Sequence, residues 1–166
     1  SSIVNDAPET FPLGETIVTW TATDDYGNIS SATQTINVVD TTAPEITSPS
    51  DVQVEATSMS QNIVDFGFAE ASDQVEISSI TNDAPTVFPL GETIVTWTAT
   101  DSSGNSASAT QTLTVVDTTA PEITSPSDVQ VEASSAENNI IELVGLRVSD
   151  QVEISSITND APTVFP

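Results

Sequence analysis

Short runs in which apolar and polar residues alternate dominate the chain. In residues 93–100, the apolar side chains of Val95, Trp97 and Ala99 alternate with threonines, and residues 52–56 show the same pattern. Successive side chains of a β-strand point to opposite faces, so this alternation predicts half-buried strands. No segment shows the periodicity of a long amphipathic helix.

Turn-forming Pro, Gly, Asn and Asp residues separate these runs at short intervals. The predicted strands of one module are 46–56 with a break at Pro49, 62–69, 75–81, a short passage ending at Phe88, 92–100 and 106–116. About seven short antiparallel strands are typical of a two-sheet, immunoglobulin-like sandwich. The predicted fold class is therefore all-β, made of tandem immunoglobulin-like β-sandwich modules.

The chain repeats itself with a period of 77 residues. Residues 40–56 return unchanged at 117–133, and residues 78–89 return unchanged at 155–166. Repetition this strict indicates an array of one structural module.

The period divides the chain into three predicted parts. Residues 41–117 form one complete module, residues 1–40 resemble the second half of a module, and residues 118–166 resemble the first half of another. Either the chain is a window from a longer polypeptide, or the halves complete each other head to tail between neighbouring chains. The segment that opens the chain returns, with three changes, at residues 155–166. This counts against head-to-tail completion, because the completed module would contain one copy of this segment too many.

Charge restricts the partners that the chain can bind. It has 25 acidic residues against the single base Arg147, with no lysine or histidine, and a net charge of −24. Nucleic acid is excluded, because phosphate contacts require clustered Lys and Arg. No apolar run approaches the ~20 residues of a membrane span, so we expect no direct membrane insertion. Charge this unbalanced calls for bound cations, high salt or an elongated shape, which fits a location outside the cell.

The residue types that catalysis requires are largely missing. The chain has no Cys, His or Lys, which removes disulfides, thiol and imidazole chemistry and amine nucleophiles. Paired carboxylates remain, but carboxylate catalysis needs a cleft, which a small sandwich filled by its own core does not offer. We therefore expect no enzymatic activity.

Two motifs carry a family resemblance. The run FPLGETIVTWTATDSSGN at residues 88–105 is followed by a strand and then by VVDTTAP at residues 115–121. This combination resembles the hyalin repeat (HYR) module over the whole period. The resemblance implies an immunoglobulin-like fold in extracellular adhesive, matrix or surface proteins. Because the cysteine pair of the animal version is missing, the resemblance points to a prokaryotic surface array.

Acidic and amide side chains gather around the junction between modules. Asp40 ends one module and Glu45 opens the next, and an immunoglobulin topology places the loops carrying Asp73, Asp101 and Asn105 at the same end. Carboxylate and amide oxygens around a linker suit Ca²⁺, which takes 6 to 8 oxygen ligands. The sequence therefore predicts a calcium site at this junction.

The second junction repeats this arrangement with Asp117, Glu122 and Asp150, and residues 24–28 are the matching loop of the first half-module. A second interpretation stays open. Asp-x-x-Gly-Asn is also an ordinary tight turn in which Asp bonds its own backbone, and Asp-Thr-Thr-Ala-Pro is also a stiff linker. The linear spacing matches no EF-hand loop.

Four aromatic residues are predicted to fill module cores, because they lie in or beside apolar alternation: Phe11, Trp20, Phe88 and Trp97. Asn28-Ile29-Ser30 is an N-glycosylation sequon. The loop position of Asn28 equally suits a turn residue or a metal ligand.

Together these observations predict a structural array, a stalk, fibre or filament of a prokaryotic cell surface that serves adhesion. Its expected partners are adjacent modules, neighbouring copies of itself, and a surface protein or glycan. One alternative is a carbohydrate- or protein-binding module, for which Tyr26 is the obvious exposed aromatic candidate. Another is a passive spacer of a secreted enzyme.

Overall fold

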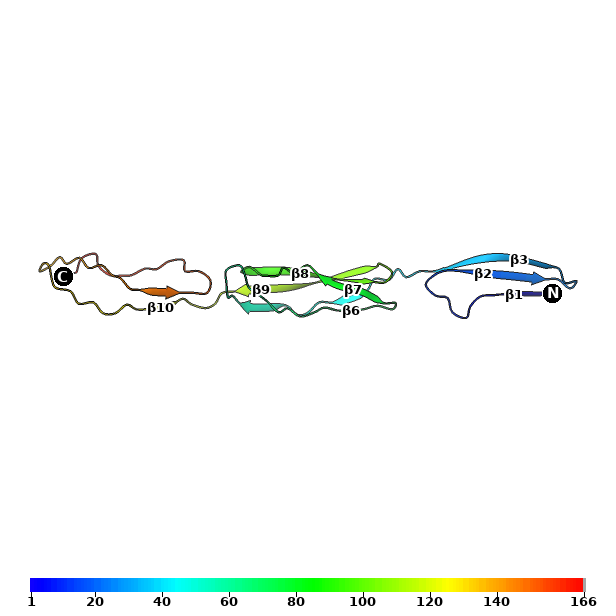
Figure 1. Ribbon diagram of the computed structural model, residues 1–166, viewed down its shortest axis with the longest axis horizontal. Coiled ribbons are helices and arrows are strands. Elements are labelled where there is room, and N and C mark those ends of the chain that lie inside the picture. Colours follow the sequence, from blue (N-terminus) through cyan, green and yellow to red (C-terminus); the bar gives the residue numbers. More distant parts are fainter. Residues whose placement is uncertain (166) are drawn as a thin grey trace. The chain divides into compact units, whose positions relative to one another are not determined.

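The computed structural model describes residues 1–165 as strands joined by turns and loops (Figure 1). The described residues contain no helix, and so none that could cross a membrane. The predicted fold class is confirmed: the chain is all-β and has an immunoglobulin-like β-sandwich architecture.

Residues 1–40 form one antiparallel sheet in the order β1-β2-β3. Its strands are β1 (Ser2–Asn5), β2 (Gly14–Thr23) and β3 (Ile29–Val38). Val18 is the one buried apolar residue described in this sheet, whereas Phe11 and Trp20 are 37% and 40% exposed. The prediction that these two aromatic residues lie in a core is wrong, because a single sheet buries its apolar face only under a second layer.

The central module has six strands in two sheets, with orders β5-β9-β8-β7 and β4-β6. Its strands are β4 (Glu45–Thr47), β5 (Val52–Glu55), β6 (Glu70–Ser72), β7 (Ile77–Asn82), β8 (Gly91–Asp101) and β9 (Ser106–Val116). β5 runs parallel to β9, with Val52 opposite Leu113. The strand pairs in residues 1–40 and 122–149 are antiparallel.

Most of the predicted strands form close to their expected bounds, and Pro49 separates β4 from β5 as expected. The predicted strand over residues 62–69 is wrong. That segment holds a single bridge from Asn62 to Phe88, and the strand begins only at Glu70. Gly67 has a φ of +78°, which interrupts extended backbone.

Alternation along β8 and β9 builds the core of the central module. Val95, Trp97 and Ala99 of β8 are buried, as are Leu113 and Val115 of β9. The intervening threonines are less buried, so the strand faces predicted from the sequence are confirmed.

Aromatic packing closes one part of this core. Phe66 lies edge-on to Phe88 and tilted against Trp97, with ring centroids 5.9 Å apart in both pairs. Edge-to-face contacts at this spacing are favourable beyond the area they bury. Phe66 is half-buried and therefore packs against the core rings from a segment that makes no regular strand.

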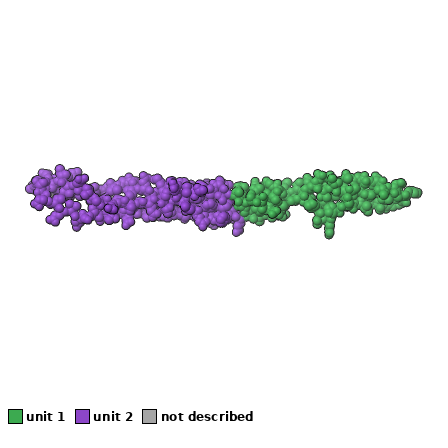
Figure 2. All heavy atoms as spheres, viewed as in Figure 1, with its two compact units in different colours: residues 1–46, 71–81, 98–108 green, residues 47–70, 82–97, 109–166 purple. Residues whose placement is uncertain are grey.

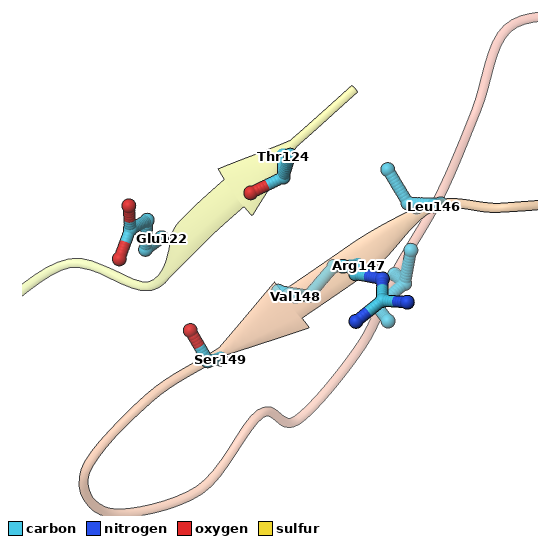
Figure 3. Close-up of a pocket in the computed structure, with 7 residues that line it drawn as sticks. Glu122, Thr124, Leu146, Arg147, Val148 and Ser149 are labelled. Carbon is cyan, nitrogen blue, oxygen red and sulfur yellow. The ribbon is translucent and has the colours of Figure 1, made fainter. Parts of the chain in front are cut away.

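The C-terminal residues start a third module in the same way as the central one. β10 (Glu122–Thr124) pairs antiparallel with β11 (Arg147–Ser149), one period after β4 and β6. Figure 3 shows β10, which carries Glu122 and Thr124, beside the strand that carries Arg147, and these three residues line a cavity of about 640 Å³.

The chain divides into two compact units, coloured separately in Figure 2. The first comprises residues 1–46, 71–81 and 98–108, and the second comprises residues 47–70, 82–97 and 109–166. The long strands β8 and β9 contribute residues to both. Asp40, Asp73 and Asp101 all lie within the first unit.

Candidate metal centre

Three aspartates that are distant in the sequence meet in the first unit. Asp40 follows β3, Asp73 follows β6 and Asp101 ends β8. One carboxylate oxygen of each lies within 4.8 Å of the others. Three like charges this close repel one another unless a cation or hydrogen bonds offset them.

Asp101 is the most buried of the three, with 2% of its surface exposed. Its Oδ1 accepts hydrogen bonds from the backbone N–H groups of Ser103 (2.9 Å) and Asn105 (2.8 Å), and its Oδ2 accepts one from Asn105 Nδ2 (2.8 Å). Burial alone would raise the pKa of Asp101, but hydrogen bonds from Asn105, Ser103 and Gly104 outweigh it and hold the pKa below its usual value. The carboxylate therefore stays ionised, within a tight turn in which Gly104 has a φ of +92°.

Asp40 leaves one oxygen without a partner. Its Oδ1 accepts a hydrogen bond from the Thr42 N–H at 3.1 Å, whereas its Oδ2 is buried and has no partner among the described residues. Asp73 similarly uses Oδ1 to accept the Val75 N–H at 2.9 Å. A buried carboxylate oxygen without a partner is costly, and a bound cation would offset that cost.

Two further predicted ligands take different positions. The amide of Asn105 presents its nitrogen to the group, donating to the carbonyl oxygen of Asp40 (3.3 Å) as well as to Asp101. In this arrangement Asn105 orients Asp101 and the linker. Glu45 lies exposed at the start of β4, outside the group of three carboxylates.

The chemistry of the donor set suits a hard divalent cation. All three side chains offer carboxylate oxygen, and the chain has no His or Cys to favour a transition metal. Ca²⁺ takes 6 to 8 oxygen ligands, so backbone oxygens or water would supply the remainder. The residues present therefore fit Ca²⁺.

The second junction repeats the local turns in the second unit. Asp117 accepts the Thr119 N–H at 3.2 Å, and Asp150 accepts the Val152 N–H at 2.8 Å, as Asp40 and Asp73 do one period earlier. Asp150 and Glu122 line one cavity of about 220 Å³. The counterpart of the Asp101 loop lies in residues 24–28.

These features describe a repeating β-sandwich with acidic residues at the junctions between modules. Sequence comparisons with known proteins point to the same kind of module. Residues 39–115 match the HYR domain family. The chain is 41% identical over 179 residues to hyalin of Strongylocentrotus purpuratus, covering 99% of this chain and 15% of that protein. It is 44% identical over 129 residues to hyalin of Lytechinus variegatus, covering 72% of this chain and 24% of that protein. These findings support an HYR domain in this chain.

A third relative is a rat protein, sushi, von Willebrand factor type A, EGF and pentraxin domain-containing protein 1. It is 38% identical over 101 residues, covering 59% of this chain and 3% of that protein. All three relatives are animal proteins, so the expectation of a prokaryotic array finds no support. The chain spans less than a quarter of the length of the hyalins that it matches. The module bounds at residues 41 and 117 stay a prediction.

The loop between β2 and β3 reproduces the turn of Asp101. Asp24 accepts hydrogen bonds from the N–H groups of Tyr26 (2.9 Å) and Asn28 (2.8 Å) and from Asn28 Nδ2 (2.7 Å). The side chain of Asn28, then its backbone, lower the pKa of Asp24 below its usual value. Because the Asn28 amide nitrogen would carry a glycan, glycosylation there would disturb this turn, and it stays a prediction.

Sequence reasoning missed Glu55, which holds the linker leaving the central module. Its Oε1 accepts hydrogen bonds from the N–H groups of Thr118 (2.8 Å) and Thr119 (3.1 Å) and from Thr119 Oγ1 (2.8 Å). Its Oε2 accepts one from Thr118 Oγ1 at 2.7 Å. The alternation of apolar and polar residues places Glu55 on the solvent face of a strand. The available signal was that Glu55 and the two threonines all lie in blocks repeated without change.

Proposed function

We propose that this chain is part of an extracellular protein in which HYR domains in tandem act mechanically, as a stalk or fibre that serves adhesion. The observation that carries this proposal is that the HYR domain binds both of its linkers. Asn105 donates to the carbonyl oxygen of Asp40 on the entering side, and Glu55 accepts four hydrogen bonds from Thr118 and Thr119 on the leaving side.

Contacts of this kind favour a structural role. A linker that is fixed to its module transmits force and holds the next module in one orientation, whereas a free linker behaves as a flexible coil. Adjacent modules and neighbouring copies are the proposed partners. The net charge of −24 favours solubility and repels nucleic acid and anionic surfaces. The similarity to hyalins over nearly the whole chain supports an extracellular, adhesion-related repeat module.

Electron microscopy of the full-length protein, with and without a chelator, tests the mechanical role. We expect straight fibres or rods. Separate globular particles in both conditions would contradict it and favour a ligand-binding module. Rods that bend freely only in chelator would indicate that a divalent cation stiffens the junctions.

We further propose that Asp40, Asp73 and Asp101 hold Ca²⁺ at the junction. Support comes from the convergence of the three carboxylates and from the buried Oδ2 of Asp40 that lacks a partner. A cation there would offset the local repulsion and tie the entering linker to the loops that carry Asp73 and Asp101.

Thermal unfolding in CaCl₂ and in chelator tests this site, with Asp73→Asn as the variant. Asparagine keeps the turn that accepts the Val75 N–H but removes the charge. At a Ca²⁺ concentration about 100 times Kd, binding should stabilise the wild type by about 2.7 kcal/mol. We expect Asp73→Asn to lose this gain. The control Asp65→Asn, which removes an equal charge from an exposed position, should retain it. Identical melting of the wild type in calcium and chelator would refute the site.

Recognition of a surface protein or glycan is a second candidate function, favoured by the exposure of two aromatic rings. Tyr26 is 93% exposed and Phe68 is 88% exposed, and exposed aromatic rings are common in binding surfaces. Glycan-array binding by the wild type that is lost in Tyr26→Ser or Phe68→Ser would support recognition. Binding that both variants retain would count against these rings as the contact.

A further inference from the structure

We propose that two copies of this chain bind side by side through β7 (Ile77–Asn82), which pairs antiparallel with the same strand of a second copy. This deepens the proposed fibre and rests on it, because it assigns the surface through which neighbouring copies meet. The contact joins two identical surfaces, so a twofold axis relates the two copies.

β7 is an edge strand of the four-stranded sheet in the central module. In the order β5-β9-β8-β7 it has β8 on one side and, among the described residues, no strand on the other. Unpaired backbone N–H and C=O groups along such an edge form a template for a further strand. Five of the six residues of β7 are exposed and the sixth is half-buried. This edge is therefore accessible to a partner.

β7 carries none of the features that usually keep an edge strand from pairing. Exposed edges are normally protected by charged side chains, proline, bulges or short length. β5, at the other edge of the same sheet, has only four residues, one of them Glu55. β7 has six residues, none of them charged and none a proline. Of the two edges, β7 is the one suited to accept a strand.

The pairing with β8 determines which backbone groups of β7 point outward. The Asp83 N–H donates to the carbonyl oxygen of Thr96 on β8 at 3.3 Å, so the backbone of Asp83 faces β8. Backbone groups of successive residues in a strand point to opposite sides. Those of Ser78, Ile80 and Asn82 therefore face the free edge, where each offers a donor and an acceptor.

These three residues are complementary to themselves in one antiparallel register. When Ile80 lies opposite Ile80 of the second copy, Ser78 lies opposite Asn82 in both directions. Each pair then exchanges both of its N–H···O bonds. Opposite residues share a face of the sheet, so Ile80, which is 38% exposed, is covered by its counterpart.

Electrostatics favour the same register. Each copy has a net charge of −24, so two copies repel each other most where carboxylates meet. Glu76 precedes β7 and Asp83 follows it. In the proposed register Glu76 lies opposite Ala84, and Asp83 lies opposite Ile77. No carboxylate is opposite another, and the strand itself is a surface on which two acidic chains can meet.

The strand is repeated along with the module. Residues 78–83 return unchanged at 155–160, and residues 1–6 differ from them only by Val4 in place of threonine. A contact through one pair of edge strands is weak by itself. When modules stand in tandem, as in the proposed fibre, each contact raises the effective concentration for the next. Repetition therefore makes a weak lateral contact sufficient between fibres.

Cysteine cross-linking tests the register, because the chain has no cysteine of its own. Ser79 and Thr81 are exposed and lie opposite each other in the proposed pair, at a Cα distance of about 4.5 Å, which a disulfide can bridge. Mixing Ser79→Cys with Thr81→Cys under mild oxidation should give a mixed dimer, identified by its mass.

Either variant alone should cross-link far less, because its two substituted positions lie diagonally across the pair, about 7–8 Å apart. Equal cross-linking in the mixture and in the single variants, or no cross-linking in the mixture, would overturn the proposal.

A charge exchange at Ile80 separates lost pairing from a damaged fold. Ile80→Glu in both cysteine variants places like charges directly opposite each other and should lower the yield of mixed dimer by about fivefold. Ile80→Lys in one variant against Ile80→Glu in the other should restore the yield, because unlike charges then face each other. A fold damaged by Ile80→Glu would not recover in this way.

The control for this exchange is Gln61→Lys, added to one of the two Ile80→Glu variants. It supplies the same charge at an exposed position away from β7 and should not restore the mixed dimer. Failure of Ile80→Lys to restore the dimer, or equal restoration by Gln61→Lys, would contradict pairing through β7.

Ionic strength gives an independent measurement. Because both copies are acidic, the yield of mixed dimer should rise when NaCl is raised from about 10 mM to about 150 mM, which shortens the screening length from about 30 Å to about 8 Å. A yield that does not rise would count against a contact between two copies of this chain.

Failure of this pairing is distinguishable from failure of the proposed fibre. Rods in electron microscopy together with no cross-linking would reject the pairing and leave the mechanical role. Separate particles whose β7 strands still cross-link would support the pairing and reject the fibre.

Discussion

Buried amide side chains hold the central module together in a chain that has no disulfide. Asn62 accepts hydrogen bonds from the Thr57 and Ser58 N–H groups and donates to the carbonyl oxygens of Ser58 and Phe88, all at 2.8 to 3.0 Å. Gln111, 1% exposed, bonds Trp97 and two backbone carbonyls. Both amides are repeated one period away, as Asn139 and Gln34. Each buried donor and acceptor that they satisfy would otherwise cost stability.

Replacing Gln111 with leucine should therefore destabilise the module strongly. The change leaves the buried Trp97 N–H without a partner, at about 1–3 kcal/mol, and removes hydrogen bonds to the part-buried carbonyl oxygens of Ser50 and Phe66, at about 0.5–1.5 kcal/mol each. We expect a loss of roughly 2–6 kcal/mol in the free energy of unfolding, measured by urea titration. The same change at exposed Gln61 should alter it by less than about 0.5 kcal/mol. Equal losses in the two variants would contradict a structural role for the buried amide.

At the scale of elements, carboxylates control how strands pass into linkers and loops. Asp101 closes the turn between β8 and β9, and Asp24 closes the equivalent turn between β2 and β3. Glu55, at the end of β5, fixes the linker that follows β9. The backbone N–H of Thr118, then its hydroxyl and that of Thr119, lower the pKa of Glu55 below its ordinary value of 4.5.

The linker contact should therefore depend on pH. Because the pKa of Glu55 is lower in the folded chain, its stabilising contribution is complete above pH 4.5 and is lost as the pH falls through the folded value. The amide NMR signal of Thr118 should shift in that acidic range. In Glu55→Gln this shift should disappear, whereas Glu132→Gln, an equal change at an exposed position, should leave it intact. A titration unchanged in Glu55→Gln would exclude this carboxylate as the cause.

Over the whole molecule, unbalanced negative charge is the dominant electrostatic fact. Arg147 is the single basic side chain, and within residues 1–165 no ion pair of a side-chain cation is present. Repulsion among carboxylates in a chain of charge −24 opposes folding and is weakened by salt. Specific binding of Ca²⁺ and general screening can be separated, because screening depends only on ionic strength.

Raising NaCl from about 10 mM to about 150 mM shortens the screening length from about 30 Å to about 8 Å. We expect Tm to rise by a few degrees, on the order of 1 kcal/mol of stability. CaCl₂ at the same ionic strength should raise Tm further if Asp40, Asp73 and Asp101 bind the ion. Equal effects of the two salts would leave screening as the whole explanation. No rise with NaCl would show that repulsion does not limit stability.

Sequence alone determined the features that depend on neighbours along the chain. Alternation around Trp97 set the strand and its buried face, because successive side chains of a strand point in opposite directions. Pro49 and Gly104 marked a break and a turn, since their backbone preferences are local. The strict period gave the modular organisation, and the motifs around Phe88 and Asp117 indicated the HYR domain.

Tertiary structure decided which groups are covered and which distant groups meet. Trp20 and Trp97 have the same local sequence pattern but differ in burial, because burial requires a second layer that lies elsewhere in the chain. Half-buried Phe66 packs against Phe88 and Trp97 without belonging to a strand. Glu55 binds Thr118 and Thr119, which lie 63 and 64 residues further along the chain. Convergence of Asp40, Asp73 and Asp101 likewise arises only when three loops fold to one end. Such contacts join positions far apart in sequence, and no local pattern of side chains encodes the distance between them.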